Sequence, residues 1–226
     1  MTKSLMGRKR GMTQVFDEKG NVVTCTVIHA EPNVITQIKT DENDGYKAVQ
    51  MGFEEVVVND PRTIENRVSK PLIGHYKKAG VQPRRFLFEA RVEKTDDFQL
   101  GQKMDVSLFE GEKFVDVSGV SIGKGYAGTI KKYNYSGGPA SHGSGHHRHA
   151  GSTGMRSTPG RCFPGGPRPS HMGNENVTVQ NLRVVQIDVE NNLILVEGAV
   201  PGHKNSMVVL RNAVKKQKAA KKKSHK

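Results

Sequence analysis

The sequence predicts a mainly β fold: a small β-barrel with a short helical insertion and a long loop extension that has no hydrophobic core. Short runs of β-branched and aromatic residues alternate with turn-forming clusters on both sides of the chain's middle. The middle, from Gly119 to Asn176, is rich in Gly and Pro and nearly lacks large aliphatic residues after Ile130. Because strand-like sequence resumes afterwards, we expect this loop to be an insertion within one fold.

The first part of the chain, residues 1–120, is typical of globular sequence. Pro71 to Ala79 predicts a short helix, and the pattern is less regular over an insert of about residues 61–100. Turn clusters such as Glu31-Pro32-Asn33 separate the candidate strands. These strands are Val22–His29, Val34–Ile38, Tyr46–Phe53, Arg85–Glu93, Lys103–Leu108 and Phe114–Val117. Short strands at this spacing favour a barrel or sandwich over a doubly wound sheet.

Strand character returns in residues 177–210, which we assign to the same β-barrel domain as residues 1–120. The expected strands are Val177–Val179, Leu182–Val189, Leu193–Val196 and Met207–Leu210, with Asn191-Asn192 as a hairpin turn. Residues 121–176 then form the extended loop. Such a stretch cannot bury enough apolar area to offset the entropy of ordering its backbone, so we expect no core within it.

The charge of the chain predicts a polyanionic partner. The formal net charge of its 226 residues is +13, and no Asp or Glu occurs between Asp116 and Glu175. Residues 211–226 form a basic tail without any acid. Its lysines include Lys215, Lys216, Lys218, Lys221, Lys222 and Lys223. Lys and Arg that neutralise phosphates release condensed counterions, so we expect this charge to favour nucleic acid.

The cysteines and the N-terminus indicate a cytoplasmic protein. Cys25 and Cys162 cannot form a disulfide framework and match no zinc spacing. The basic N-terminus lacks the apolar run of a signal peptide, and no window approaches 18 consecutive apolar residues. We expect no membrane and no small-molecule substrate as partners.

Enzymatic interpretations find little support in the loop. Gly123-Lys124-Gly125-Tyr126-Ala127-Gly128 matches the dinucleotide-binding GxGxxG motif, which also needs a long helix and an acidic residue about 20 positions later. Only a short helical stretch can follow, and the acid is absent. No acidic residue lies near the loop's serines and histidines in sequence to orient a histidine, although a long-range triad using Asp105 or Asp116 stays open. We expect no enzymatic activity and no cofactor.

The loop also contains a cluster of metal-ligating residue types. These are His142, His146, His147 and His149, followed by Cys162 and His171. Metal-bound histidines usually donate their second nitrogen to a carboxylate or carbonyl, and no carboxylate lies nearby in sequence. The Gly-rich backbone also offers no fixed scaffold for tetrahedral geometry. We therefore expect no metal.

RNA binding accounts for the composition of the loop. Glycine allows the backbone to approach phosphates closely. The loop's cations have no acidic neighbours in sequence, and they are Lys124, Lys131, Lys132, Arg148, Arg156, Arg161 and Arg168. Tyr126, Tyr133, Tyr135 and Phe163 offer flat faces on which unpaired bases can stack.

Several motifs resemble the bacterial large-subunit ribosomal protein L-three family. They include Gly11-Met12-Thr13-Gln14-Val15-Phe16, the run Gly123 to Gly128, Ser136 to Ser144, Thr158-Pro159-Gly160-Arg161, His171 to Leu182 and Val196 to Gly202. The resemblance spans residues 5 to about 210. It implies a β-barrel of the translation-factor type with a long loop extension.

The resemblance further implies a structural constituent of the large ribosomal subunit. Such a protein binds the large-subunit (23S) rRNA, nucleates subunit assembly, contacts neighbouring large-subunit ribosomal proteins and sends its extension toward the peptidyl transferase centre. Carried onto this chain, the rRNA contacts also include Ser141, His142, His147, His171 and Asn174. The loop tip would consist of Gly151, Ser152, Gly154 and Met155.

Two positions depart from the family. Met155 stands where some members carry a Gln that is methylated on its side-chain amide, so this modification should be absent. The segment Phe163 to Ser170 has Arg168 as its only charge, where many members have a lysine-rich run. An alternative interpretation of the whole chain is a free-standing RNA-binding regulator or chaperone.

Overall fold

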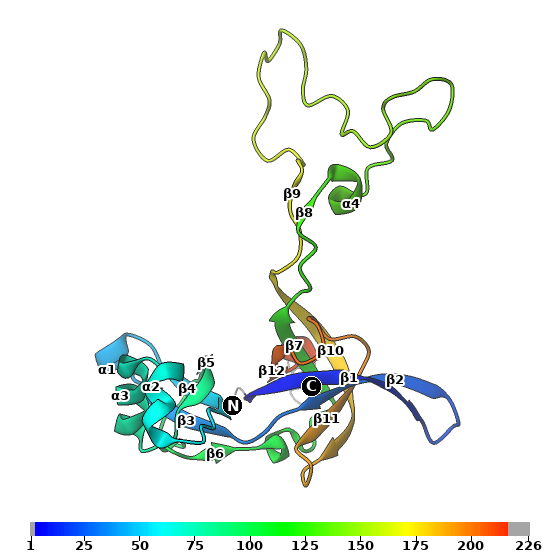
Figure 1. Cartoon of the computed structure of the whole chain (residues 1–226). Coiled ribbons are helices and arrows are strands. Elements are labelled where there is room, and N and C mark those ends of the chain that lie inside the picture. The colour runs from blue at the N-terminus through cyan, green and yellow to red at the C-terminus, as the bar shows by residue number, and fades with distance from the viewer. Residues whose placement is uncertain (1–2, 217–226) are drawn as a thin grey trace, which may run out of the picture. The chain divides into compact units, whose positions relative to one another are not determined.

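A computed structural model describes residues 3–216 of the chain. The residues form two compact units, and each is described by itself (Figure 1). The globular unit comprises the chain up to Val120 and again from Asn176, and the unit that we call the arm comprises Ser121–Glu175.

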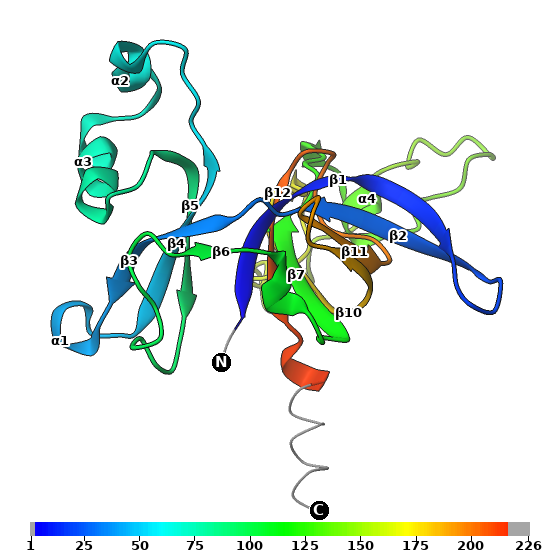
Figure 2. The same cartoon turned by 90° about the horizontal axis from the view of Figure 1, so that it is seen from below.

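Six antiparallel strands of the globular unit form a closed barrel in the order β1-β12-β7-β10-β11-β2 (Figure 2). They are β1 (Ser4–Phe16), β2 (Val22–His29), β7 (Phe114–Val120), β10 (Asn176–Asp188), β11 (Leu193–Glu197) and β12 (Met207–Asn212). The predicted barrel is thus confirmed. Closure pairs Leu5 of the first strand with Leu210 of the last.

The barrel encloses an apolar core because alternate residues of its strands point inward. Leu5, Ile28, Val117, Ile194 and Leu210, from five of the strands, are fully buried in it. β10 contributes partly buried side chains, and the short 3-10 helix η2 (Val106–Phe109) adds Val106 and Phe109.

The arm leaves and re-enters the globular unit through neighbouring strands. β7 ends at Val120, β10 begins at Asn176, and these two residues are paired. β10 is continuous from Asn176 to Asp188, although the sequence predicted two strands with a break near residue 180. The break is a bulge, because Asn181 takes a left-handed φ of 59° and the pairing with β7 shifts between Val179 and Leu182.

A second, four-stranded sheet has the order β5-β4-β3-β6 and is separate from the barrel. Its strands are β3 (Asn33–Lys39), β4 (Ala48–Glu55), β5 (Arg84–Arg91) and β6 (Lys103–Met104). Its buried face includes Ile35, Val49, Met51 and Phe53, and Met6 of β1 and Val209 of β12 pack into the same cluster. The expectation that these segments belong to the barrel was wrong, because alternation of apolar residues identifies a strand and not the sheet it joins.

Short helices connect the strands of this second sheet. They are α1 (Asp41–Asp44), η1 (Pro61–Thr63), α2 (Ile64–Arg67) and α3 (Lys70–Ala79). α3 begins at Lys70, with Pro71 in its first turn, and Gly80 with φ 69° ends it, close to the predicted helix from Pro71 to Ala79. Buried Tyr76 attaches α3 to β5 by donating its hydroxyl proton to the carbonyl of Arg84 at 2.8 Å.

The segment 103–108 was predicted as one strand, but β6 ends at Met104. Asp105 then accepts a hydrogen bond from the Ser107 N–H at 3.2 Å, which caps η2 and turns the backbone out of the strand. No helix among residues 3–216 is long and apolar enough to cross a membrane.

Candidate nucleic-acid interface

The arm begins as a narrow two-stranded neck, which β8 (Tyr126–Ala127) and β9 (Ser170–His171) complete. The N–H of Lys124 donates to the carbonyl of Met172, and the N–H of Met172 donates to the carbonyl of Gly125, both at 2.9 Å. Gly173 packs so closely that a Cβ atom there would overlap the carbonyl of Ile122. The neck therefore consists mainly of backbone pairing, which Gly173 makes possible.

Lys132 holds the one helix found in the described arm, α4 (Thr129–Tyr133), against the end of the neck. Its ammonium group donates to the hydroxyl of Ser170 at 2.6 Å and to the carbonyl of His171 at 3.0 Å. Lys132 is half-buried, and its ammonium lies 5.4 Å from the centroid of the Tyr133 ring. Lys132, which the sequence analysis counted among the rRNA contacts, also links parts of the arm in this way.

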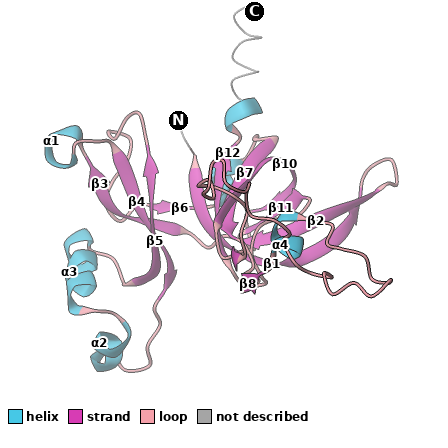
Figure 3. Ribbon diagram, turned by 90° about the horizontal axis from the view of Figure 1, so that it is seen from above, coloured by secondary structure: helices cyan, strands magenta, loops and turns pink. Residues whose placement is uncertain are grey.

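Between α4 and β9 the arm consists of loops without regular secondary structure (Figure 3). The first loop is closed at its base by Gly137 and Gly138, whose backbones lie against the carbonyls of His147 and His146. A Cβ atom on Gly138 would overlap the His146 carbonyl oxygen. The rings of His146 and His149 stack with centroids 5.3 Å apart. This loop therefore has a defined base.

The second loop contains the predicted tip residues Gly151, Ser152, Gly154 and Met155, all of which are exposed. The hydroxyl of Ser152 donates to the carbonyl of Gly154 at 2.9 Å, which makes a tight turn. The guanidinium of Arg161 lies 5.2 Å from the centroid of the Phe163 ring. Both the Phe163 ring and the Met155 side chain remain largely exposed.

The cations of the arm differ from those of the globular unit in their partners. Lys124, Lys131, Arg148, Arg156, Arg161 and Arg168 are all exposed. The ion pairs found among residues 3–216 all lie in the globular unit, for example Lys3–Glu112 at 3.0 Å and Arg183–Glu197 at 2.6 Å. Within the described residues, the arm's cations therefore lack carboxylate partners. Their charge remains available to an external anion.

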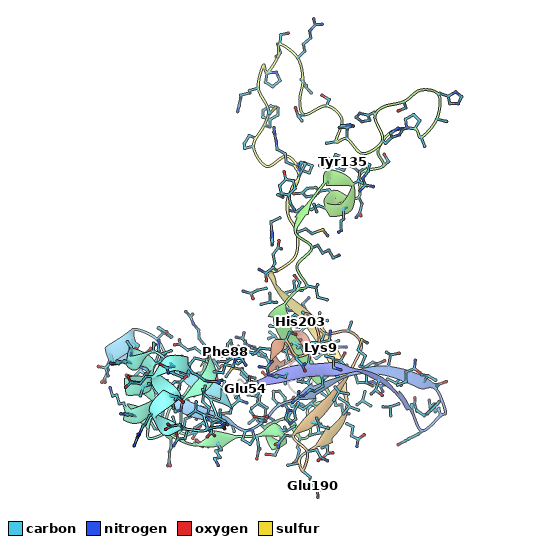
Figure 4. The ribbon with its side chains drawn as sticks, viewed as in Figure 1. Lys9, Glu54, Phe88, Tyr135, Glu190 and His203 are labelled. Atoms are coloured by element: carbon cyan, nitrogen blue, oxygen red, sulfur yellow. The ribbon has the colours of Figure 1, made fainter. Side chains whose placement is uncertain are left out.

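The other predicted contact residues are also at the surface of the arm. Ser141, His142, His147, His171 and Asn174 are exposed, and His142 and Asn174 each take a φ of 55°. Tyr126, which pairs with His171 across the neck, is 78% exposed and offers a free ring face. Figure 4 shows the side chains along the arm and labels Tyr135, which follows α4 closely.

In the predicted basic tail, Lys215 and Lys216 are exposed, and the Lys216 ammonium lies 4.9 Å from the centroid of the Phe114 ring. Lys218, Lys221, Lys222 and Lys223 lie outside the described residues. Among the residues described, no three His, Cys, Asp or Glu side chains are grouped as metal ligands would be.

Sequence reasoning missed the two contacts that give the arm its shape. Neither the link from Lys132 to Ser170 nor the packing of Gly138 on His146 was predicted. The adjacent glycines before Pro139 were the available signal for close backbone packing. A lysine in a basic segment gives no comparable signal, because its sequence neighbours do not reveal a partner that lies 38 positions away.

Comparisons with known proteins agree with these features. The sequence profile of the family described as Ribosomal protein L3 matches residues 76–189. A relative from Protochlamydia amoebophila (strain UWE25), named large ribosomal subunit protein uL3, is 60% identical over 99% of this chain and 94% of its own length. Relatives of the same name from Chlamydia felis and Chlamydia pneumoniae are 53% and 54% identical over 93% of this chain and 96% of theirs. The chain therefore belongs to the ribosomal protein L3 family.

Proposed function

We propose that this protein is a structural component of the large ribosomal subunit and binds the 23S rRNA directly through its arm. The observation that carries the proposal is the set of exposed arm cations without carboxylate partners among the described residues. The names of the relatives support the assignment to the large subunit. In this role the protein acts as a scaffold, without a reaction of its own.

The arm suits contact with folded RNA for a physical reason. Its neck is held by backbone hydrogen bonds, so its side chains remain free to face outward. Exposed Tyr126 and Phe163 can stack on unpaired bases, and the neighbouring arginines can pair with phosphates. We further propose that the arm reaches toward the peptidyl transferase centre and that its early binding nucleates assembly.

The salt dependence of RNA binding tests direct contact by the arm. Replacing Arg148 and Arg156 with Ala should reduce the slope of log K against log salt by about 0.7–0.9 for each phosphate that is no longer neutralised. The matched control replaces Arg62 and Arg67 with Ala, since both are exposed in the globular unit. Filter binding to 23S rRNA fragments at several salt concentrations measures the slope. An unchanged slope in the arm variant would contradict the proposed binding of phosphate by these arginines.

Depletion tests the place of the protein in the subunit. Sucrose-gradient profiles after depletion should show fewer large subunits and an accumulation of incomplete precursors. A normal profile would instead favour a free-standing RNA-binding protein. For the tip, chemical cross-linking from position 155 in assembled subunits should reach rRNA close to the peptidyl transferase centre.

A further inference from the structure

The β1–β2 hairpin continues beyond the other strands of the barrel (Figures 1 and 2). The two strands pair with each other as far as Phe16 and Val22. β12 pairs with β1 only up to Arg8, and backbone hydrogen bonds to residues 205 and 206 extend this contact to Lys9. Among the described residues, no strand pairs with the outer edge of β1 from Gly11 to Phe16.

This free edge lacks the features that normally prevent strands from pairing with other chains. Gly11 to Phe16 contains no charged residue and no proline. Met12, Phe16 and Val22 are 51%, 72% and 54% exposed, and alternation places them on one face of the hairpin. In contrast, the outer strand β5 of the second sheet carries four charged residues, Arg84, Arg85, Glu89 and Arg91.

The other face of the hairpin borders a hollow. Val15 and Val23 are paired and line an open cavity of about 510 Å³ together with Arg183 and Val184 of β10. Asp17 and Glu18 from the hairpin turn also line it. The Nε of Arg183 donates a hydrogen bond to the Glu197 carboxylate at 2.6 Å. The hollow therefore combines an apolar wall with two carboxylates, and it can accept an aliphatic side chain next to a basic one.

We propose that the edge of β1 from Gly11 to Phe16 docks an extended segment of a neighbouring protein in the ribosomal particle, which adds as a further strand. In strand addition, main-chain hydrogen bonds supply affinity, and alternate side chains supply specificity. The partner segment would have apolar residues at alternate positions, to cover Met12 and Phe16, and a Lys or Arg to face Asp17 and Glu18.

Charge distinguishes a protein partner from RNA at this place. Residues 11–24 contain two acids, Asp17 and Glu18, against one base, Lys19, although the whole chain carries +13. Phosphates would be repelled by the two carboxylates, and they cannot cover an apolar face. The free edge offers backbone donors and acceptors that another polypeptide can satisfy in full.

Site-specific photo-cross-linking tests the proposal, which rests on the proposed ribosomal function. The full chain, with a benzophenone amino acid in place of Phe16, replaces the resident copy in cells, and large subunits are purified. We expect cross-links to one neighbouring protein, at a segment with alternating apolar residues and a nearby base. The same group in place of Val57, which is 75% exposed elsewhere in the globular unit, should not reach that segment.

A second variant tests whether the β1 edge from Gly11 to Phe16 binds the partner segment. Met12→Lys with Val22→Lys should reduce cross-linking from position 16 by about tenfold, the reduction expected when an apolar anchor worth about 1.4 kcal/mol is removed. Val57→Lys should leave it unchanged. Positions 12 and 22 are half-exposed, so the barrel core is not altered. Circular dichroism confirms that the variant is folded.

The possible outcomes separate this proposal from the proposed function. If the protein is in large subunits and position 16 cross-links only to RNA, only to a second copy of this chain or to nothing, strand docking is wrong while the ribosomal role stands. Equal cross-linking in the Met12→Lys, Val22→Lys variant also overturns it. Absence of the wild-type protein from large subunits contradicts both.

Discussion

Asp116 places a buried carboxylate between two segments that are far apart in sequence. Its Oδ1 accepts a hydrogen bond from the Asn181 N–H at 2.8 Å, and its Oδ2 accepts one from the Val214 N–H at 3.2 Å. The first bond stabilises the bulge of β10, and the second holds the backbone that follows β12. A single side chain of β7 thus ties together the strands on both sides of it.

Replacing Asp116 with Ala should lower the free energy of unfolding by about 1–3 kcal/mol, because two backbone N–H groups are left without their acceptor in a buried site. Urea unfolding followed by circular dichroism measures the change. Asp97→Ala is the matched control, since Asp97 is exposed. Equal stability of the two variants would show that water replaces the carboxylate at no cost.

The polar network on the second sheet gives a pH dependence with a defined sign. Burial alone would raise the pKa of Glu89, but hydrogen bonds from Lys39, Tyr46 and Gln50 outweigh it and lower this pKa. Hydrogen bonds to Tyr46 and to Glu89 raise the pKa of Lys39. A carboxylate with a lowered pKa stabilises the fold above its unfolded pKa of about 4.3, and this contribution disappears as pH falls through the folded value.

Unfolding free energy should therefore fall between about pH 5 and pH 3, and Glu89→Gln should reduce this fall. The raised pKa of Lys39 affects stability at alkaline pH. Its contribution to the free energy of unfolding is complete below the unfolded pKa of about 10.4 and is lost as pH rises through the higher folded pKa. Glu65→Gln is the control, because Glu65 is an exposed carboxylate of α2. Urea titrations across this range measure the effect. The proposed role of Glu89 is wrong if the unfolding free energy of both variants falls at acid pH as much as that of the wild-type protein.

The two cysteines should differ in reactivity. Cys25 is fully buried, and burial raises the pKa of its thiol, whereas Cys162 is exposed on the arm. Because the thiolate is the reactive form, a thiol reagent at about pH 8 should modify Cys162 quickly and Cys25 only after unfolding. Cys162→Ser should abolish the fast phase. Two equal fast phases in the native protein would contradict the buried position of Cys25.

At the scale of the element, the loops of the arm depend on close backbone packing more than on side chains. Gly138→Ala should open the base of the first loop, because its Cβ atom would overlap the carbonyl oxygen of His146. We expect faster amide exchange in residues 136–148 without a change in the melting temperature of the globular unit. Gly145→Ala is the control, since open space surrounds that position. Equal exchange in both variants would mean that the loop lacks this base.

The strands were largely predictable, and the sheet that each joins was not. Val22–His29 is β2 with the predicted bounds, since a run of β-branched residues between turns has few alternatives. Val34 and Met51 have the same alternating pattern, yet their strands belong to a separate sheet. Partner choice depends on contacts between distant segments, which one sequence does not display. The bulge at Asn181 escaped prediction for the same reason, because it depends on Asp116.

At the scale of the whole molecule, the arm adds little to the stability of the globular unit. Within the described arm, only Ala127 and Thr129 are buried, both close to the neck. Replacing residues 138–170 with a short Gly-Ser linker should leave the melting temperature of the globular unit nearly unchanged, since hydrophobic stabilisation scales with the apolar area buried. Differential scanning calorimetry measures this. A deletion with the same linker across β3 is the destabilising control, because it removes buried Ile35.

The position of the arm could be predicted from composition, and its internal geometry could not. The absence of acids between Asp116 and Glu175 marks a stretch that nearly coincides with the arm, Ser121–Glu175. The same composition marked Lys132 as a phosphate contact, although its ammonium binds Ser170 and His171. Composition reports where charge is concentrated, while three-dimensional contacts decide which charges remain free. Lys132 therefore has a structural role within the arm, and its contact with RNA stays a prediction.

The pairing of the first strand with the last has a consequence for the order of events during synthesis. β1 can pair with β12 only after residues 207–212 have been synthesised and have left the ribosome. β7 can pair with β10 only after the whole arm has been synthesised, because the arm lies between them in sequence. The arm therefore emerges before the barrel can close. Under the proposed function, a newly made chain can therefore bind RNA through its arm while its own fold is still incomplete, before the barrel closes.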